Sequence, residues 1–369
     1  MSKTPNQPVP KNGISGLVPY KPGKRPDPSI GKTFKLSANE SPLGPSPKAL
    51  EAFHHTSSDL FSYPDPSASV LRAAIARRYG LNPDHLVCGN GSDELLNLIA
   101  RIYLGPGDEG IYTQYGFTVY AIAIKANGAT PIIAPEHDFR VNVDEILNRV
   151  TERTKVVFLA NPNNPTGTHL PQSEVRRLSE GLPKGCVLVL DAAYAEFVRV
   201  NDYEAGIELV STTENTIMTR TFSKIYGLAG IRLGWAYASE NIIDAISRVR
   251  DPFNINGPAL AAAVAAFEDA SYTEKVREHN DIWLPKLRDA LIKAGLEVTP
   301  SLCNFLLLHF PDVNGKRASD AHKFLADQGL MLRQMDEYNL PNALRLSVGT
   351  QEANELVIAA ITSFMQSKD

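Results

Sequence analysis

The amino-acid sequence predicts an α/β protein with a large domain, in which helices cover a mostly parallel sheet, and a smaller α+β domain. Continuous apolar segments of strand length recur at 155–160, 186–191 and 215–221, and helical patterns separate them. Strands that helices cover on both faces have this composition. The chain also has 369 residues, which is more than one hydrophobic core usually holds.

The elements that precede these strands fit the same plan. A helical pattern covers 68–79, a short strand follows at 85–88, and the glycine turn at 89–91 opens an apolar helix over 92–104. Open α/β sheets bind ligands beyond the carboxyl ends of their strands. We therefore expect the functional site in the segments that directly follow the strands.

A different pattern after Gly257 predicts the small domain. Its expected elements are helices over 258–270 and 273–295, a strand over 305–310, a helix over 318–330, strands near Met331 and Leu344, and a last helix from Gln351. Seven prolines within residues 1–30 predict an extended arm. The expected division is an arm over 1–44 that joins the small domain, a large domain over 45–272 and a small domain over 273–369.

Composition and charge argue against several classes of protein. With a net charge of −4 at pH 7, the chain has no basic footprint for nucleic acid or an anionic membrane. The spacings of Cys88, Cys186 and Cys303 fit neither a disulfide framework nor a zinc motif, and we expect no metal. No apolar run approaches the roughly 18 residues that span a bilayer, and no signal-peptide pattern is present. We therefore expect a cytoplasmic protein.

Two segments at strand ends could hold polar or anionic groups. Segment 89–94, Gly-Asn-Gly-Ser-Asp-Glu, opens a helix, and the N–H groups of a helix start suit a phosphate. An ordinary helix that Ser92 or Asp93 caps is the alternative. Segment 161–167, Asn-Pro-Asn-Asn-Pro-Thr-Gly, follows a strand as an unusual loop. It is either a simple turn or a source of an amide donor for a ligand oxygen.

Two further segments carry ionisable side chains at strand ends. Asp191 ends an apolar strand, where a carboxylate needs a partner, and Tyr194 follows three residues later. A pyridine cofactor needs such a carboxylate beside its ring nitrogen, although a helix cap is the alternative. Lys224 follows another strand and precedes a glycine-rich segment that ends in Arg232. A lone lysine is usually a solvated charge, but an arginine so close could pair with phosphate.

Taken together and in this order, the four segments resemble those of the fold-type-I aminotransferases that depend on pyridoxal phosphate (PLP). Within that family the chain looks like the histidinol-phosphate branch, which is closely related to the aromatic aminotransferases. Two strings carry the resemblance, Thr-Phe-Ser-Lys…Gly-Leu-Ala-Gly-Ile-Arg over 221–232 and Asn-Asn-Pro-Thr-Gly over 163–167. The resemblance extends from Pro19 to the region of Arg345.

This resemblance implies a role for each candidate residue. Lys224 would hold the cofactor as a Schiff base and later move a proton, and Asp191 would pair with the ring nitrogen. Other implied contacts are Tyr194 and Asn164 at the phenolic oxygen, Tyr115 stacked on the ring, Gly91, Ser92, Asp93, Thr221, Ser223 and Arg232 around the phosphate, and Tyr63 at the phosphate of a neighbouring subunit. A homodimer with shared active sites and ping-pong kinetics is therefore implied.

The implied small-molecule substrates are an amino acid and a keto acid. Glutamate and 2-oxoglutarate would form one pair, with Arg345 at the α-carboxylate. Tyr20, Asn39 and Arg333 are candidates for contact with the other substrate, and Tyr20 with Arg333 favours histidinol phosphate. An Arg333 that faces water is equally open. An aromatic or broad-specificity aminotransferase is the close alternative, and a PLP-dependent decarboxylase of amino-acid phosphates is a more distant one.

Two functions of other classes fit the sequence less well. A nucleotide-binding dehydrogenase could use the turn at 89–91, but Glu94 stands where its glycine pattern needs a third glycine. A non-catalytic binding protein of the same fold would be expected to lack Lys224 or Asp191, and this chain has both. The sequence therefore favours an enzyme whose chemistry depends on Lys224.

Overall fold

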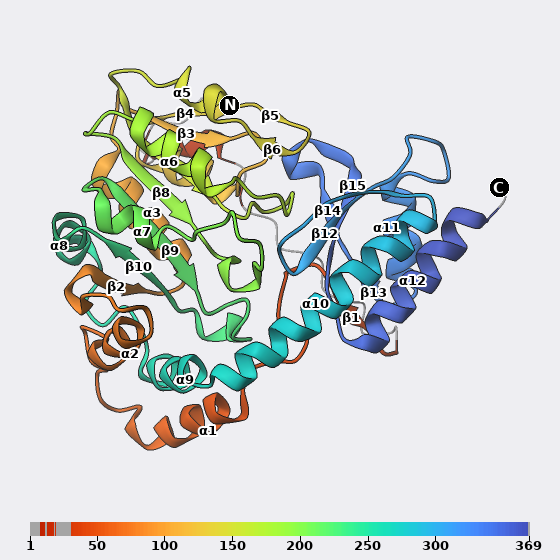
Figure 1. Cartoon of the computed structure of the whole chain (residues 1–369), viewed down its shortest axis with the longest axis horizontal. Coiled ribbons are helices and arrows are strands. Elements are labelled where there is room, and N and C mark those ends of the chain that lie inside the picture. Colours follow the sequence, from red (N-terminus) through yellow and green to blue (C-terminus); the bar gives the residue numbers. More distant parts are fainter. Residues whose placement is uncertain (1–7, 12, 18, 20–30, 368–369) are drawn as a thin grey trace.

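A seven-stranded sheet forms the centre of the large domain (Figure 1). The computed structural model describes residues 8–11, 13–17, 19 and 31–367. The strand order is β2-β10-β9-β8-β7-β3-β4. The strands are β2 (Leu86–Gly89), β3 (Glu109–Thr113), β4 (Thr130–Ala134), β7 (Thr154–Ala160), β8 (Val187–Asp191), β9 (Thr216–Thr221) and β10 (Gly234–Ala238). Only β10 within this sheet is antiparallel to its neighbours, so the predicted mostly parallel sheet is confirmed.

Alternate side chains of each central strand enter two separate cores, because successive side chains of a strand point to opposite faces. In β8, Val187 and Val189 lie in one core, and Leu188 and Leu190 lie in the other. The first core is covered by α3 (Ser92–Tyr103), α4 (Val119–Ala126) and α8 (Glu240–Val249). The second is covered by α1 (Pro47–His55), α2 (Ser69–Tyr79), α5 (Val143–Leu147), α6 (Gln172–Gly181), α7 (Ile207–Thr212) and α9 (Gly257–Glu268).

The small domain has a four-stranded antiparallel sheet of order β11-β12-β15-β14. Its strands are β11 (Glu297–Thr299), β12 (Phe305–His309), β14 (Arg333–Met335) and β15 (Leu340–Ser347). Two helices, α11 (Ala318–Asp327) and α12 (Gln351–Gln366), cover it. Leu36 joins this core, and β1 (Phe34–Lys35) pairs with β13 (Leu330–Met331). The described end of the arm therefore packs on the small domain. The remaining pair of strands is the hairpin of β5 (Glu136–His137) and β6 (Arg140–Val141).

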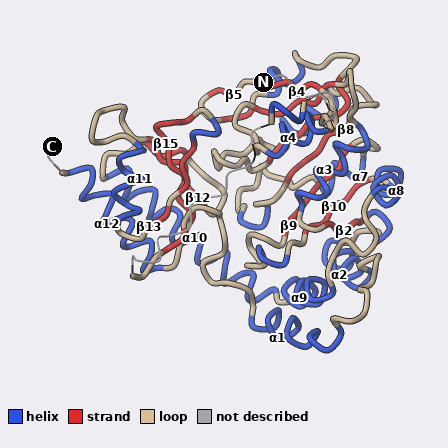
Figure 2. The backbone as a smooth tube through the Cα atoms, turned by 180° about the vertical axis from the view of Figure 1, so that it is seen from behind, coloured by secondary structure: helices blue, strands red, loops and turns tan. Residues whose placement is uncertain are grey.

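One long helix, α10 (Ala270–Lys293), runs between the two domains (Figure 2). Val276, near its start, packs in the large-domain core, whereas Leu287 and Leu291 pack in the small-domain core. The boundary expected at 272/273 thus falls inside a helix that both cores share. The helix therefore connects the two domains through both of their cores.

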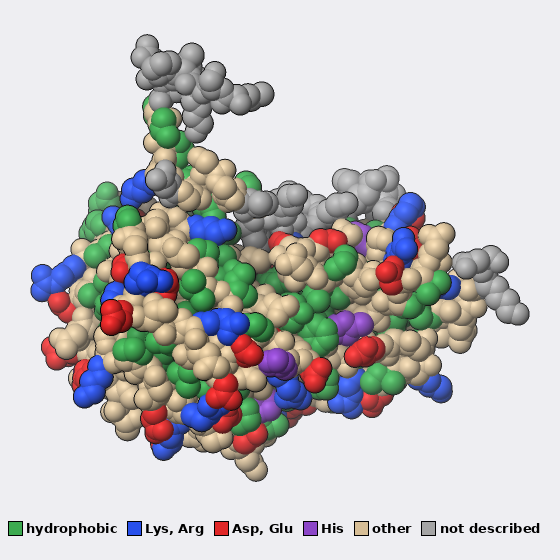
Figure 3. All heavy atoms as spheres, turned by 90° about the horizontal axis from the view of Figure 1, so that it is seen from above, with side chains coloured by type: hydrophobic (Ala, Val, Ile, Leu, Met, Phe, Trp, Pro, Cys, Tyr) green, Lys and Arg blue, Asp and Glu red, His purple; other side chains and the backbone are tan. Residues whose placement is uncertain are grey.

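The surface shows no large field of one charge on the face in Figure 3, where basic and acidic side chains are interspersed. Among the described residues, no helix has the length and apolar composition that crossing a bilayer requires.

Candidate active site

A cavity of about 540 Å³ lies beyond the carboxyl ends of β7, β8 and β9 and reaches the small domain. Parallel strands bring their ends to one edge, so segments far apart in sequence meet there. Twelve of the predicted site residues line the cavity, namely Asn39, Ser92, Asp93, Asn164, Asp191, Tyr194, Thr221, Ser223, Lys224, Arg232, Arg333 and Arg345. The cavity therefore lies where the sequence predicted the functional site, beyond the carboxyl ends of the strands.

The Asp191 carboxyl is buried at the end of β8. The hydroxyl of Tyr120 donates to its Oδ2 at 2.6 Å, and the Thr219 hydroxyl donates to its Oδ1 at 3.4 Å. Burial raises the pKa of Asp191 to about 6, although the Tyr120 hydrogen bond lowers it. A carboxylate in this position would gain from a cationic partner inside the cavity.

The Lys224 amine lies in the same cavity, on the segment that follows β9. Its Nζ donates to the backbone oxygen of Ala38 at 3.1 Å and lies 5.8 Å from the centre of the Tyr194 ring. Burial and then the Arg345 guanidinium lower the pKa of Lys224 to about 8. A sizeable fraction of the amine is therefore neutral near pH 8, which is the form that can attack a carbonyl or accept a proton.

Tyr194 and Asn39 form a buried pair on the wall beside Lys224. The Asn39 amide donates to the Tyr194 hydroxyl at 2.9 Å. The backbone N–H of Asn39 donates to Ser347 Oγ at 2.8 Å, and Ser347 donates back to Asn39 Oδ1 at 2.9 Å. The side-chain hydrogen bonds of Asn39 thus fasten the arm to Tyr194 and to β15.

The start of α3 meets Arg232 at the opposite end of the cavity. The helix begins at Ser92, and the capping position is Gly91, with no side-chain cap, so the alternative of a Ser92 or Asp93 cap is wrong. Gly91 has a φ of 80°, and a Cβ there would lie 2.6 Å from Arg232 Nη2. Arg232 pairs with Asp93 at 3.0 Å and reaches Ser223 Oγ at 3.5 Å. An uncapped helix start beside a guanidinium and a hydroxyl suits a phosphate.

Two arginines of the small domain close the cavity from the other side. Arg333 and Arg345 face each other across β14 and β15 in register, and both are buried. Arg345 donates to Asn164 Oδ1 and, at 2.8 Å, to the backbone oxygen of Ser37. Its Nε is buried without a hydrogen-bond partner among the described residues. Arg345 therefore retains a donor for an anionic ligand.

Arg333 pairs with Glu337, which also lines the cavity. The reading of Arg333 as a charge that faces water is therefore wrong, because its side chain is only 9% exposed and lies against the cavity. Glu337 stands just beyond β14 and orients the guanidinium. The small-domain wall therefore carries a guanidinium, which can bind an anion, and a carboxylate, which can accept a hydrogen bond.

Two predicted residues lie away from the cavity, and a third is outside the described part of the chain. Tyr115 does not line the cavity, because the chain turns after β3 and its ring packs on Phe139, with 5.4 Å between centroids. The ring of Tyr115 is therefore not placed to stack on a ligand in this cavity, and Phe117, two residues later, lines it instead. Tyr63 is 81% exposed and stacks on Phe253, away from this cavity. Tyr20 lies outside the described residues.

Sequence reasoning missed several lining residues, notably Tyr120, Asn97, Phe117 and Glu337. Tyr120 and Asn97 stand within ordinary apolar helices, where nothing in the pattern distinguishes them from core or surface positions. Glu337 stands four residues after Arg333, but Arg333 is on strand β14, where that spacing does not predict a pair. Only the packing of α3 and α4 against the strand ends shows that Tyr120 reaches Asp191.

Comparison with known proteins agrees with this fold. A family model described as aminotransferase class I and II matches residues 31–361. The chain therefore belongs to the aminotransferase class I and II family. The α/β fold and the transaminase class that the sequence predicted are thereby confirmed.

Similar curated proteins narrow the comparison within this family. A histidinol-phosphate aminotransferase of Rhodopseudomonas palustris (strain HaA2) is 57% identical over 361 residues, which are 98% of this chain and 99% of that protein. One of Nitrobacter winogradskyi is 55% identical with the same coverage. The crystal structure of histidinol-phosphate aminotransferase from Sinorhizobium meliloti, in complex with pyridoxal-5'-phosphate, is 30% identical. It has a TM-score of 0.84 and covers 91% of this chain and 92% of its own.

Proposed function

We propose that this aminotransferase uses PLP to interconvert imidazole acetol phosphate and L-histidinol phosphate, with glutamate and 2-oxoglutarate as the other pair. The observation that carries the proposal is the position of the Lys224 amine, which shares one cavity with Asp191 and with two buried arginines. The amine supplies the reactive group, the carboxyl suits a pyridine nitrogen, and the arginines suit anionic substrates. The similar histidinol-phosphate aminotransferases support the choice of substrate.

The residues present fit PLP at each of its functional groups. The uncapped start of α3, Thr221, Ser223 and Arg232 would hold the phosphate. Asp191 would pair with the ring nitrogen, and Tyr194 and Asn164 would hydrogen-bond to the phenolic oxygen. The close contact of Gly91 with Arg232 is part of this fit, because a side chain at position 91 would fill the space that the guanidinium needs.

Lys224 is the residue of this chain that would take part directly in the reaction. When bound, PLP supplies an aldehyde and a pyridinium ring that accepts the electron pair left when the substrate Cα loses its proton. The neutral form of the Lys224 amine would hold the cofactor through its aldehyde carbon, and the free amine would take the proton from the substrate Cα. The depressed pKa of Lys224 keeps that form available near neutral pH.

Arg345 and Arg333 would hold the two ends of the substrates. Arg345 has a buried Nε donor and suits the α-carboxylate of glutamate. Arg333, which lies opposite Arg345 on the neighbouring strand, would bind the phosphate of histidinol phosphate. An aromatic amino acid is the second candidate, because Phe117 and Tyr338 also line the cavity and could contact a phenyl ring.

A substrate comparison tests this proposal. We expect kcat/KM with 2-oxoglutarate to be at least about 100-fold higher for histidinol phosphate than for phenylalanine or tyrosine, since charge-assisted hydrogen bonds to the phosphate contribute roughly 3 kcal/mol. An equal or higher value for phenylalanine or tyrosine would favour the aromatic assignment. No transfer from any of the three would contradict both.

We also propose a cytoplasmic homodimer in which Tyr63 contributes to the partner's site. Tyr63 belongs to an exposed apolar surface that also contains Leu60 (68% exposed), Phe61 (89%) and Val70 (65%). An adjacent cavity of about 730 Å³ has a largely apolar lining. A monomer rarely exposes such a surface. The three cysteines are buried and unpaired, which suits a reducing compartment.

Hybrid dimers test the shared site directly. Lys224→Ala and Tyr63→Ala each damage both sites of their own dimer, but a hybrid of the two has one site with both changes and one with neither. We therefore expect mixing of the two weakly active proteins, after subunit exchange, to restore about a quarter of the wild-type activity, as random assortment into dimers predicts. A wild-type protein that is fully active as a monomer in sedimentation would rule the shared site out. Cell fractionation tests the location.

A further inference from the structure

A buried ion pair lies behind the reactive groups, on the side of the sheet away from the cavity lining. Arg220 Nη1 donates to Glu196 Oε1 at 2.9 Å, and the two side chains are only 7% and 5% exposed. The guanidinium also lies over the rings of Tyr79 and Trp235, at 5.4 and 5.8 Å from their centroids. Neither member of the pair lines the active-site cavity.

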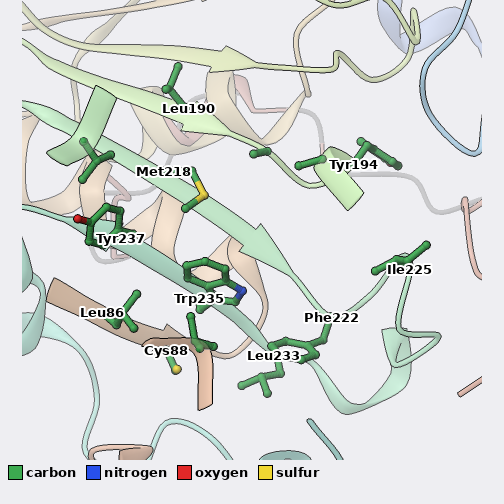
Figure 4. Close-up of a cluster of buried hydrophobic side chains, with 14 of the residues drawn as sticks. Leu86, Cys88, Leu190, Tyr194, Met218, Phe222, Ile225, Leu233, Trp235 and Tyr237 are labelled. Atoms are coloured by element: carbon green, nitrogen blue, oxygen red, sulfur yellow. The ribbon is translucent and has the colours of Figure 1, made fainter. Parts of the chain in front are cut away.

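The pair joins the two segments that carry Lys224 and Tyr194. Arg220 is on β9, four residues before Lys224, and Glu196 lies two residues after Tyr194 in a short 3-10 turn, η4 (Ala195–Phe197). Figure 4 shows Tyr194, Phe222 and Ile225 at the ends of β8 and β9, in the buried cluster that also contains Trp235. No backbone ladder joins these segments once the strands have ended.

The same segment is fastened to the helix that connects the domains. Arg277 of α10 donates from Nε to the backbone oxygen of Glu196 at 2.6 Å. Arg199, three residues after Glu196, pairs with Asp281 of α10 at 3.1 Å. The small domain, which supplies Arg345, is thus connected through α10 to the segment that carries Tyr194.

Stability does not explain this pair. Removing two charges from water costs several kcal/mol each, and well-packed apolar side chains often serve a core as well or better. Glu196 Oε2 and Arg220 Nε are also buried without a hydrogen-bond partner among the described residues, which adds to the cost. What the pair does provide is a fixed, directional link between two loops that packing alone would hold less precisely.

We propose that Glu196 and Arg220 are positioning residues, which together fix the Lys224 amine in relation to the Tyr194 hydroxyl. The 5.8 Å between Lys224 Nζ and the Tyr194 ring is the distance that they would set. The proposal rests on the proposed function for the binding of PLP and for its activity readout. Its second readout, the visible absorption of the PLP-loaded protein, requires no knowledge of the substrate.

A double-mutant cycle tests this proposal. Glu196→Gln, Arg220→Met and the double variant are loaded with PLP and compared with Arg176→Met, which breaks the exposed Arg176–Glu208 pair as a control. The readouts are the melting temperature, kcat and KM for the preferred amino donor, and the pH midpoint of the visible absorption band. Glu196→Asp and Arg220→Lys keep both charges and serve if a larger change prevents folding.

Positioning predicts that each single variant loses about tenfold in kcat per folded site, with KM within about twofold, and that the absorption midpoint moves. The double variant should be no slower than the worse single one, because the pair acts as one unit. A lower melting temperature with unchanged kcat and midpoint would reduce the pair to a structural role and overturn the inference. If the wild type accepts none of the tested donors, the proposed function fails, and the absorption midpoint still decides this question.

Discussion

The two walls of the active-site cavity are built on different principles. The large-domain wall collects Asp191, Lys224 and the start of α3 from separate parallel strands, whose carboxyl ends converge. The small-domain wall places Arg333 and Arg345 on neighbouring antiparallel strands, directly opposite each other. The first arrangement gathers different chemical groups around one cofactor, and the second repeats one group at two positions. Changes to the large-domain wall should therefore affect every substrate, whereas those to the small-domain wall should discriminate between substrates.

The largest effect is expected from Lys224→Ala. Without the amine there is neither the nucleophile for the cofactor nor the base for the substrate proton, so kcat should fall by at least about 10⁴-fold for every donor. The visible absorption band of the PLP-loaded protein should also disappear. A band of wild-type intensity in this variant would show that another group holds the cofactor.

The next largest effect is expected from Asp191→Asn. The amide has nearly the same shape and still accepts from Tyr120, so PLP should remain bound, as equilibrium dialysis can measure. It cannot keep the ring nitrogen protonated, and kcat should fall by about 10²–10³-fold, in line with the loss of a preorganised charge. A rate close to that of the wild type would refute the assigned role.

A smaller and selective effect is expected at the other wall. Arg333→Gln should lower kcat/KM for histidinol phosphate by about 30–150-fold, which corresponds to 2–3 kcal/mol for a charge-assisted contact, and change the value for phenylalanine little. Arg345→Gln should instead lower kcat/KM for glutamate and for phenylalanine by similar factors. Equal losses for both substrates in Arg333→Gln would remove the distinction between the two arginines.

The same contrast explains what the sequence could predict. Strand ends are recognisable from apolar runs, so Asp191, Lys224 and the loop of Asn164 were placed correctly along with the parallel sheet. Tyr115 was misplaced because the turn after β3 decides which aromatic ring reaches the cavity, and no periodicity encodes that turn. The partner of Asp191, Tyr120, depends on how α4 packs over β8, which is a tertiary contact without a local signal. The pairing of Arg333 with Glu337 likewise appears only once the fold is formed.

The smallest effect is a pH-dependent gain of stability in cofactor-free Asp191→Asn. Burial raises the pKa of Asp191 from 3.8 to about 6, so the folded protein binds this proton more tightly than the unfolded chain does. Folding is therefore penalised increasingly as the pH rises from about 4 to 6, and the penalty is complete above 6. Urea unfolding at pH 7 should show the variant to be more stable by at most about 3 kcal/mol, since each pKa unit corresponds to roughly 1.4 kcal/mol.

At pH 3 this gain in free energy of unfolding should nearly vanish, because this pH lies below both pKa values and both states then mostly carry the proton. A gain of the same size at both pH values would mean that the raised pKa is not its cause. With PLP bound, the order should reverse, because the carboxylate then pairs with a cationic ring nitrogen, and wild type should unfold later than the variant. The group that destabilises the empty large-domain wall would thus be the one that stabilises it once the cofactor is present.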